Sequence, residues 1–210
     1  MEQRDFWHKH ARQFADLYDE PTLVNRLFRR ALYLRARQTI ERIQGVPGAA
    51  VLDVGSGPGR NSVLFVKEAG ASRVVGVDLA ADMVRIAREL AERHGVADRC
   101  SFAQGDIMTF DPGGGRFDVA VALGVMDYVA DPAAMLARMR ELSRREVIAS
   151  FPAFAPLRVA QRRIRYALGG CRVYWFWKSE IEGFFRKAGF AGCELLPCSR
   201  AGWLGIGRIG

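Results

Sequence analysis

The feature that most constrains this chain is a short apolar segment that runs directly into closely spaced glycines, within Val51–Gly59. An apolar run of this length before a glycine cluster is typical of a strand buried on both faces of a parallel sheet. Glycine lets the backbone turn tightly and lets a ligand approach with no Cβ in its way. The segment therefore predicts a buried strand followed by a ligand-binding loop. The glycines stand at every second position: Gly55, Gly57 and Gly59.

The spacing of these glycines and one nearby acid narrow the kind of ligand. Loops that bind dinucleotides read G-x-G-x-x-G, whereas the third glycine here falls one residue early and Arg60 stands in its place. Asp53 lies two residues before the first glycine. A carboxylate at that point attracts a ligand that carries an ammonium group and repels a pyrophosphate. We therefore expect a ligand other than a nicotinamide dinucleotide.

Strand and helix patterns alternate along most of the chain. This alternation predicts βαβ units with right-handed crossovers, and hence a doubly wound α/β fold whose parallel sheet carries helices on both faces. Ligands of such sheets bind beyond the carboxyl ends of the strands, so functional residues are expected just after positions 53, 78, 104 and 123. Strands are predicted at 49–54, 73–78, 99–104, 117–123 and 145–151, and helices at 22–44, 82–93 and 132–142, with a further helix ending at residue 69.

Acidic and apolar residues stand at two of these strand ends. Asp78 ends the second strand, where a carboxylate can accept hydrogen bonds from both hydroxyls of a ribose. After the third strand, Gly105–Asp106 offers a carboxylate that can accept the amino group of an adenine. Met83 and Ile107 could enclose the adenine ring, although a methionine at helical spacing is more often a core residue. These residues predict a site for an adenosyl ligand.

Taken together, the Asp53 glycine loop, Asp78, Gly105–Asp106 and the Leu123–Gly124 turn resemble the motifs of the class I S-adenosylmethionine-dependent methyltransferases over residues 45 to 150. The resemblance implies a seven-stranded, mostly parallel sheet of Rossmann-like type whose last strand is antiparallel. It implies S-adenosylmethionine as cofactor and S-adenosylhomocysteine as product. Metal-dependent methyltransferases of the catechol type need a cluster of acids and Asn near the acceptor, and the sequence offers none, so we predict no metal. The cofactor-binding residues that it implies are Asp53, Gly55, Ser56, Gly57, Gly59, Asp78, Leu79, Met83, Gly105, Asp106, Ile107, Leu123, Gly124 and Tyr18.

We expect residues 1–210 to form a single methyltransferase domain, because no repeat, linker or low-complexity segment interrupts the pattern. Residues 1–45 would form N-terminal lid helices, as is usual in that family, and residues 46–151 the cofactor-binding core. Residues 152–178 would shape the acceptor site. Residues 179–210 would supply a last helix, opened by a capping box at Ser179–Glu182 and closed by Gly189, and two final strands near 193–196 and 203–209.

Composition limits the remaining possibilities. The chain has 31 lysines and arginines against 23 acids, a net charge of +8, and all but four of the basic residues are arginines. Guanidinium groups favour phosphates and carboxylates, but an arginine-rich surface is also common without an anionic partner. No apolar run approaches the ~20 residues of a membrane span. The four cysteines form no metal-binding or C-x-x-C pattern, so we expect a reduced, cytoplasmic protein.

The acceptor and the catalytic groups follow less directly from the sequence. Asp127 and Tyr128 come just after the fourth strand and are candidate catalytic residues, with His8 and His10 as second candidates. A capping role for Asp127 is an equal alternative. Aromatic and basic residues between the fifth strand and the last helix favour a small hydrophobic or aromatic acceptor, and a basic helix at 158–172 could contact an anionic membrane. The candidate acceptor-binding residues are Tyr128, Phe154, Arg158, Tyr174 and Trp177.

Two other functions stay open at this point. The net charge of +8 suggests RNA methylation, but no Asn-Pro-Pro-Tyr-type motif follows the fourth strand, where the chain reads Gly124–Asp127. The other alternative is a binding module that has the fold without the activity. The presence of the whole glycine loop and of acids for both ribose and adenine argues against that alternative.

Overall fold

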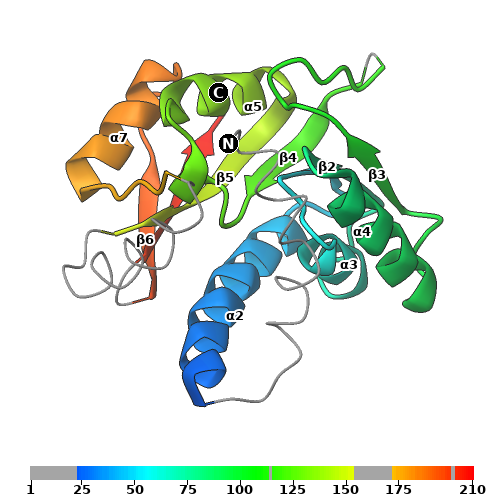
Figure 1. Ribbon diagram of the computed structural model, residues 1–210. Helices are drawn as coiled ribbons and strands as arrows, with labels where there is room; N and C mark the ends of the chain where they lie inside the picture. The colour runs from blue at the N-terminus through cyan, green and yellow to red at the C-terminus, as the bar shows by residue number, and fades with distance from the viewer. Residues whose placement is uncertain (1–22, 114, 154–171, 200–201) are drawn as a thin grey trace.

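The computed structural model describes residues 23–113, 115–153, 172–199 and 202–210 (Figure 1). Its centre is one seven-stranded sheet with the strand order β3-β2-β1-β4-β5-β7-β6. Strands β1 to β5 pair in parallel, and β7 pairs antiparallel with both β5 and β6. This confirms the expected fold and the antiparallel last strand. The strands are β1 Ala50–Val54, β2 Arg73–Asp78, β3 Cys100–Gln104, β4 Phe117–Ala122, β5 Ser143–Pro152, β6 Glu194–Ser199 and β7 Gly202–Arg208.

Helices cover both faces of the sheet, and the strand residues alternate between them. Val51 of β1 belongs to the apolar cluster that includes α2, α3 and α4, whereas its neighbour Leu52 belongs to the cluster that includes α5 and α7. Figure 1 shows the two groups of helices on opposite sides of the strands. A strand buried on both faces is mostly apolar, which explains the apolar run that precedes the glycines. The helices are α2 Leu23–Gln44, α3 Arg60–Lys67, α4 Ala81–Arg93, α5 Pro132–Glu141 and α7 Lys178–Lys187, with a short 3-10 helix η1 Met126–Tyr128.

The expected elements are all present among the described residues, with ends that differ by a few positions. The capping box is placed wrongly by the sequence: α7 begins at Lys178, and Trp177 is its N-cap residue rather than Ser179. The Trp177 backbone N–H donates to Glu180 Oε2 at 2.6 Å, so the acid three residues into the helix does close the cap. At the other end, Gly189 has a φ of +87°, as expected of a helix stop.

Parallel pairing brings the carboxyl ends of three strands together. Asp53 of β1 is level with Gly76 of β2 on one side and with Val121 of β4 on the other. The chain moves outward from β1 to β2 and β3, then returns to place β4 on the other side of β1. The order therefore reverses between β1 and β4, which is the point where open α/β sheets bind ligands.

Candidate active site

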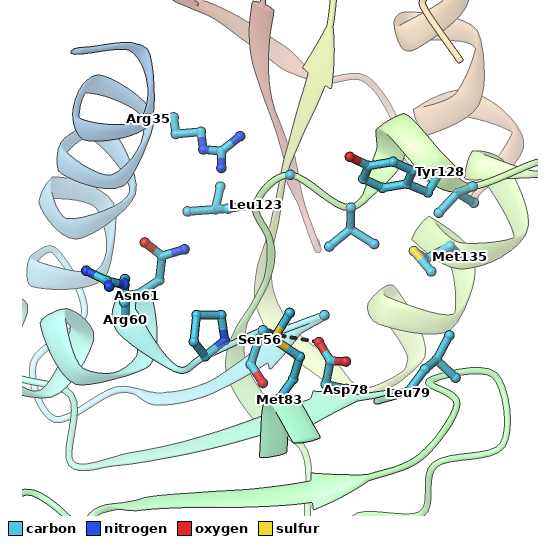
Figure 2. A pocket seen from close by; sticks show the side chains of 16 residues that line it. Arg35, Ser56, Arg60, Asn61, Asp78, Leu79, Met83, Leu123, Tyr128 and Met135 are labelled. Carbon is cyan, nitrogen blue, oxygen red and sulfur yellow. Dashed lines mark hydrogen bonds between the residues drawn. The ribbon is translucent and has the colours of Figure 1, made fainter. Parts of the chain in front are cut away.

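A pocket opens at this reversal point, beyond the carboxyl ends of β1, β2 and β4 (Figure 2). Its walls come from α2, the glycine loop, the end of β2, the turn after β4, and α5. A single cavity thus joins segments that lie far apart in the sequence. Its lining residues are Arg35, Gly55, Ser56, Gly57, Pro58, Arg60, Asn61, Asp78, Leu79, Met83, Leu123, Gly124, Val125, Tyr128, Val129 and Met135.

The backbone of the glycine loop adopts a left-handed conformation that is unfavourable for residues with a Cβ atom. Gly55, Gly57 and Gly59 have φ values of +63°, +52° and +78°. A Cβ on Gly59 would lie 2.8 Å from the Ala87 Cβ, because the loop packs tightly on α4 there, whereas a Cβ on Gly57 would meet nothing within 4 Å. Two glycines thus have different roles: one allows close packing, and the other leaves open space beside the pocket.

Asp78 holds the loop from the neighbouring strand. Its Oδ2 accepts the Gly57 backbone N–H at 2.8 Å, drawn as a dashed line in Figure 2, and its Oδ1 accepts the Ala80 N–H at 2.9 Å. Each carboxylate oxygen can accept more than one hydrogen bond, so the group keeps capacity for a ligand. The side chains of Leu79 and Met83 line the pocket beside it. The carboxylate is therefore fixed in direction before any ligand arrives.

Asp53 lies beneath the loop and does not line the pocket. Its side chain is buried, with the residue only 1% exposed, and its Oδ2 accepts the Ser62 hydroxyl of α3 at 2.5 Å. Burial raises the pKa of Asp53 to about 7, with Asp78 adding to the rise and the Ser62 hydrogen bond opposing it. The carboxyl group thus ties the end of β1 to the first turn of α3.

The turn after β3 also lies outside the pocket lining. Asp106 Oδ1 accepts the Met108 backbone N–H at 3.0 Å, and the Ile107 side chain is buried in the cluster beneath α5. The structure therefore does not bring Ile107 opposite Met83 across the cavity. Arg138 of α5 fixes this turn, since its guanidinium donates to the carbonyls of Ile107 at 3.3 Å and Phe110 at 2.8 Å.

The turn after β4 meets a residue that the sequence patterns do not reveal. Gly124 has a φ of +78°, and its N–H donates to Ser150 Oγ at 2.8 Å. A Cβ at Gly124 would lie only 2.9 Å from a terminal nitrogen of Arg35, so the guanidinium from α2 lies against the glycine backbone. Figure 2 shows Arg35 reaching from its helix toward Leu123.

Several lining residues were not among the predicted site residues. Pro58, Arg60, Asn61 and Val125 could have been found, because they lie within or directly after the glycine loop and the Leu123–Gly124 turn. Arg35, Val129 and Met135 depend on how distant segments pack, and no local pattern marks them. The residues missed are Arg35, Pro58, Arg60, Asn61, Val125, Val129 and Met135.

The candidate catalytic and acceptor residues separate into three groups. Tyr128 lines the pocket, whereas Asp127 is 8% exposed and lies outside the lining. The Asp127 carbonyl accepts the Tyr174 N–H at 2.7 Å, which joins η1 to the segment before α7. Tyr174 stacks near Phe176, and Trp177 is 60% exposed at the cap of α7, so neither reaches the cavity. Outside the described residues lie Tyr18, Phe154, Arg158, His8, His10 and most of the basic segment 158–172.

The described part of the chain contains neither a cluster of metal ligands nor a membrane-spanning helix. No group of three or more His, Cys, Asp or Glu residues in those ranges could hold a metal ion. Within the same ranges, no helix combines the length and apolar character needed to cross a membrane.

Comparisons with known proteins agree with this geometry. A family model described as a methyltransferase domain matches residues 51–146, which include the glycine loop, Asp78 and Tyr128. The magnesium protoporphyrin IX methyltransferase of Synechocystis PCC 6803, solved with bound S-adenosylmethionine, superposes with a TM-score of 0.76 at 20% identity, covering 99% of this chain and 95% of that chain. Residues 51–146 therefore form a methyltransferase domain, and the sheet has the fold of the class I S-adenosylmethionine-dependent methyltransferases. At that level of identity, the structural likeness itself is evidence for the fold alone.

Curated relatives of this methyltransferase differ in their acceptors. The erythromycin 3''-O-methyltransferase of Saccharopolyspora erythraea is 39% identical over 88 residues, 42% of this chain and 29% of that protein. The trans-aconitate 2-methyltransferase of Azoarcus is 33% identical over 101 residues, 48% of this chain and 37% of that protein. The chain thus spans about a third of the length of the curated relatives it matches.

Proposed function

We propose that this methyltransferase transfers a methyl group from S-adenosylmethionine to an O, N or C atom of a small hydrophobic or aromatic acceptor. The observation that carries the proposal is the single pocket that joins the glycine loop and Asp78 to an apolar wall. That wall includes Val125, Val129 and Met135. The relatives named for erythromycin and trans-aconitate add support, since both names refer to small molecules.

The lining residues fit the parts of this cofactor. Gly57 offers open space where a ligand can approach the backbone. The fixed carboxylate of Asp78 can accept the ribose hydroxyls, and Leu79 with Met83 offers an apolar surface for the adenine. The backbone of Leu123–Gly124 would lie beside the methionine part. We assign Asp53 an indirect role: it fixes the loop from below through Ser62.

The pocket suits in-line displacement because it can hold two reactants together and exclude water. The bound cofactor supplies a methyl group that is already electrophilic. Alignment of the two centres can contribute roughly 7–11 kcal/mol of the barrier. Tyr128 is the candidate catalytic residue that reaches the cavity, and its ring can orient an apolar acceptor.

Calorimetry tests the first half of the proposal. We expect binding of S-adenosylmethionine and S-adenosylhomocysteine, and no binding of NADH at the same concentrations. Asp78→Asn should weaken both cofactor forms by about 10-fold to 100-fold, because the neutral amide cannot form charge-assisted hydrogen bonds to the ribose. Asp82→Asn on exposed α4 surface is the matched control. Binding of NADH with indifference to the methyl donor would refute the proposal.

Methyl transfer tests the second half. The protein is incubated with S-adenosylmethionine labelled in its methyl group and with a panel of apolar and aromatic compounds bearing hydroxyl, amine or carboxylate groups. We expect labelled product to extract into organic solvent. Transfer only to RNA, lost at moderate salt, would instead identify the nucleic-acid alternative.

A further inference from the structure

The guanidinium of Arg35 faces the pocket, and no described residue pairs with it. It lines the cavity from α2, and the structure gives its side-chain nitrogens no hydrogen bond and no ion pair among the described residues. Arg37 on the exposed side of the same helix, by contrast, forms an ion pair with Glu41 at 3.2 Å. A half-buried guanidinium loses part of its hydration and needs an anion in return.

The position of this guanidinium is the end of the pocket where the methyl group would be transferred. It lies against the backbone of Gly124, beside the turn that we place next to the methionine part of the cofactor. Apolar residues also line the pocket, among them Val125, Val129 and Met135, and Figure 2 shows Met135 across the cavity from Arg35. An acceptor in this space would meet hydrocarbon as well as the Arg35 guanidinium.

We propose that Arg35 binds a carboxylate group of the acceptor, and that this carboxylate is the atom group that is methylated. The inference rests on the proposed function and narrows its acceptor to apolar or aromatic carboxylic acids. The planar guanidinium donates two parallel hydrogen bonds to a carboxylate, which fixes its plane as well as its position.

The reaction balances without a general base. One carboxylate oxygen forms the new O–CH3 bond as the C–S bond of the sulfonium breaks, and the electron pair of that bond stays on sulfur. The acceptor loses its negative charge, the sulfonium loses its positive charge, and no proton moves. Because charge disappears during the step, an apolar, water-poor pocket favours it. The burial of Asp127 away from the cavity is therefore compatible with catalysis.

The cofactor also carries a carboxylate, so the experiment must separate two sources of the same group. Arg35→Met removes the charge and keeps a long apolar side chain, and Arg37→Met makes the same change outside the pocket. Dissociation constants are measured for S-adenosylhomocysteine and for 5′-methylthioadenosine, which lacks the amino-acid carboxylate. If Arg35 binds the acceptor, both constants stay within twofold of the wild type in each variant.

The acceptor arm uses paired probes: indole-3-acetate with indole-3-acetamide, and laurate with dodecanol. We expect the wild type saturated with S-adenosylhomocysteine to bind the acids at least tenfold more tightly than their uncharged partners. We expect this preference to vanish in Arg35→Met and to persist in Arg37→Met. With labelled S-adenosylmethionine, the product should be a methyl ester that releases labelled methanol in mild alkali.

Four results would overturn the inference. If Arg35→Met weakens the binding of S-adenosylhomocysteine tenfold and leaves the binding of 5′-methylthioadenosine unchanged, Arg35 binds the carboxylate of the cofactor. Equal binding of acids and uncharged partners would show that no carboxylate is recognised. A labelled product that survives alkali would place the methyl group on another atom while leaving the proposed function intact, whereas absence of any labelled product would count against both.

Discussion

Two alanine substitutions in the glycine loop test why glycine is needed at each position. We expect Gly59 to be needed for packing and Gly57 to be needed for ligand binding. Gly57→Ala and Gly59→Ala both force alanine to a positive φ, of +52° and +78°. That conformation costs an L-residue about 1–2 kcal/mol, partly offset because alanine also has less freedom than glycine in the unfolded chain. Conformation alone therefore predicts a loss of about 1 kcal/mol in each variant.

Packing makes the two losses unequal. The new Cβ at position 59 would lie 2.8 Å from the Ala87 Cβ, 3.1 Å from the Ala87 Cα and 3.0 Å from Phe102 Cζ. Non-bonded carbon atoms prefer a separation of about 3.5–4.0 Å. Ala87 belongs to α4, so its atoms can move away only if the helix itself shifts. Overpacking of this kind costs about 1–3 kcal/mol, so Gly59→Ala should lose about 2–4 kcal/mol in total. The Cβ at position 57 meets nothing within 4 Å.

Urea unfolding and calorimetry on the two variants test this reasoning. With a slope of about 2 kcal/mol/M, the midpoint should fall by roughly 0.5 M in Gly57→Ala and roughly 1–2 M in Gly59→Ala. Gly57→Ala should also weaken the binding of S-adenosylhomocysteine at least tenfold. Gly70→Ala is the control, because Gly70 has a φ of +70° and open space but lies outside the pocket lining. Equal midpoints for positions 57 and 59, or wild-type cofactor binding by Gly57→Ala, would refute the argument.

Three further changes report on other parts of the fold. The pKa of Asp53 is about 7 in the folded protein against 3.8 as the ordinary value, so the folded chain holds a proton that the unfolded chain releases between these pH values. The free energy of unfolding should therefore fall as the pH rises from 5 to 7.5, and Asp53→Asn should flatten this dependence in urea titrations at the two pH values. Asp131 caps α5 by accepting the Ala134 N–H at 3.1 Å, and Asp131→Ala should cost about 1 kcal/mol with unchanged cofactor binding by calorimetry. Phe185 of α7 is fully buried, and Phe185→Ala should cost about 3–5 kcal/mol in urea unfolding; a loss below 1 kcal/mol would mean that the core collapses around the gap.

The sequence carries most of the fold because the strands are short and buried on both faces. Apolar runs with glycine or acidic ends locate β1 and β2 within one residue, and Asp131 with Pro132 marks the start of α5 at the correct position. The sequence places the N-cap of α7 two residues late because the actual N-cap, Trp177, has no side-chain oxygen that would mark it, whereas Ser179 has one.

The candidate site is predictable only where it is local in sequence. Asp78 and Gly57 are found because strand ends and glycine spacing mark them. Asp53 and Ile107 stand at motif positions, but the Asp53 side chain bonds to Ser62, the Ile107 side chain is buried in the cluster that includes α5, and neither residue is part of the pocket lining. Arg35 enters the cavity only because α2 packs beside β6, a contact between segments about 160 residues apart in the chain, as the Gln38 hydrogen bond to the Pro197 carbonyl also shows.

The cofactor-binding side of the pocket and Arg35 come from different parts of the chain. The matched methyltransferase domain, residues 51–146, contains the glycine loop and Asp78 but begins after Arg35. If the donor half is shared and the group that binds the charge of the acceptor comes from outside the matched range, relatives can keep one chemistry while their acceptors differ, as the names of erythromycin and trans-aconitate methyltransferases indicate. Acceptor choice in this protein should therefore respond to changes in α2 far more than to changes in the glycine loop, which should alter the binding of every acceptor equally.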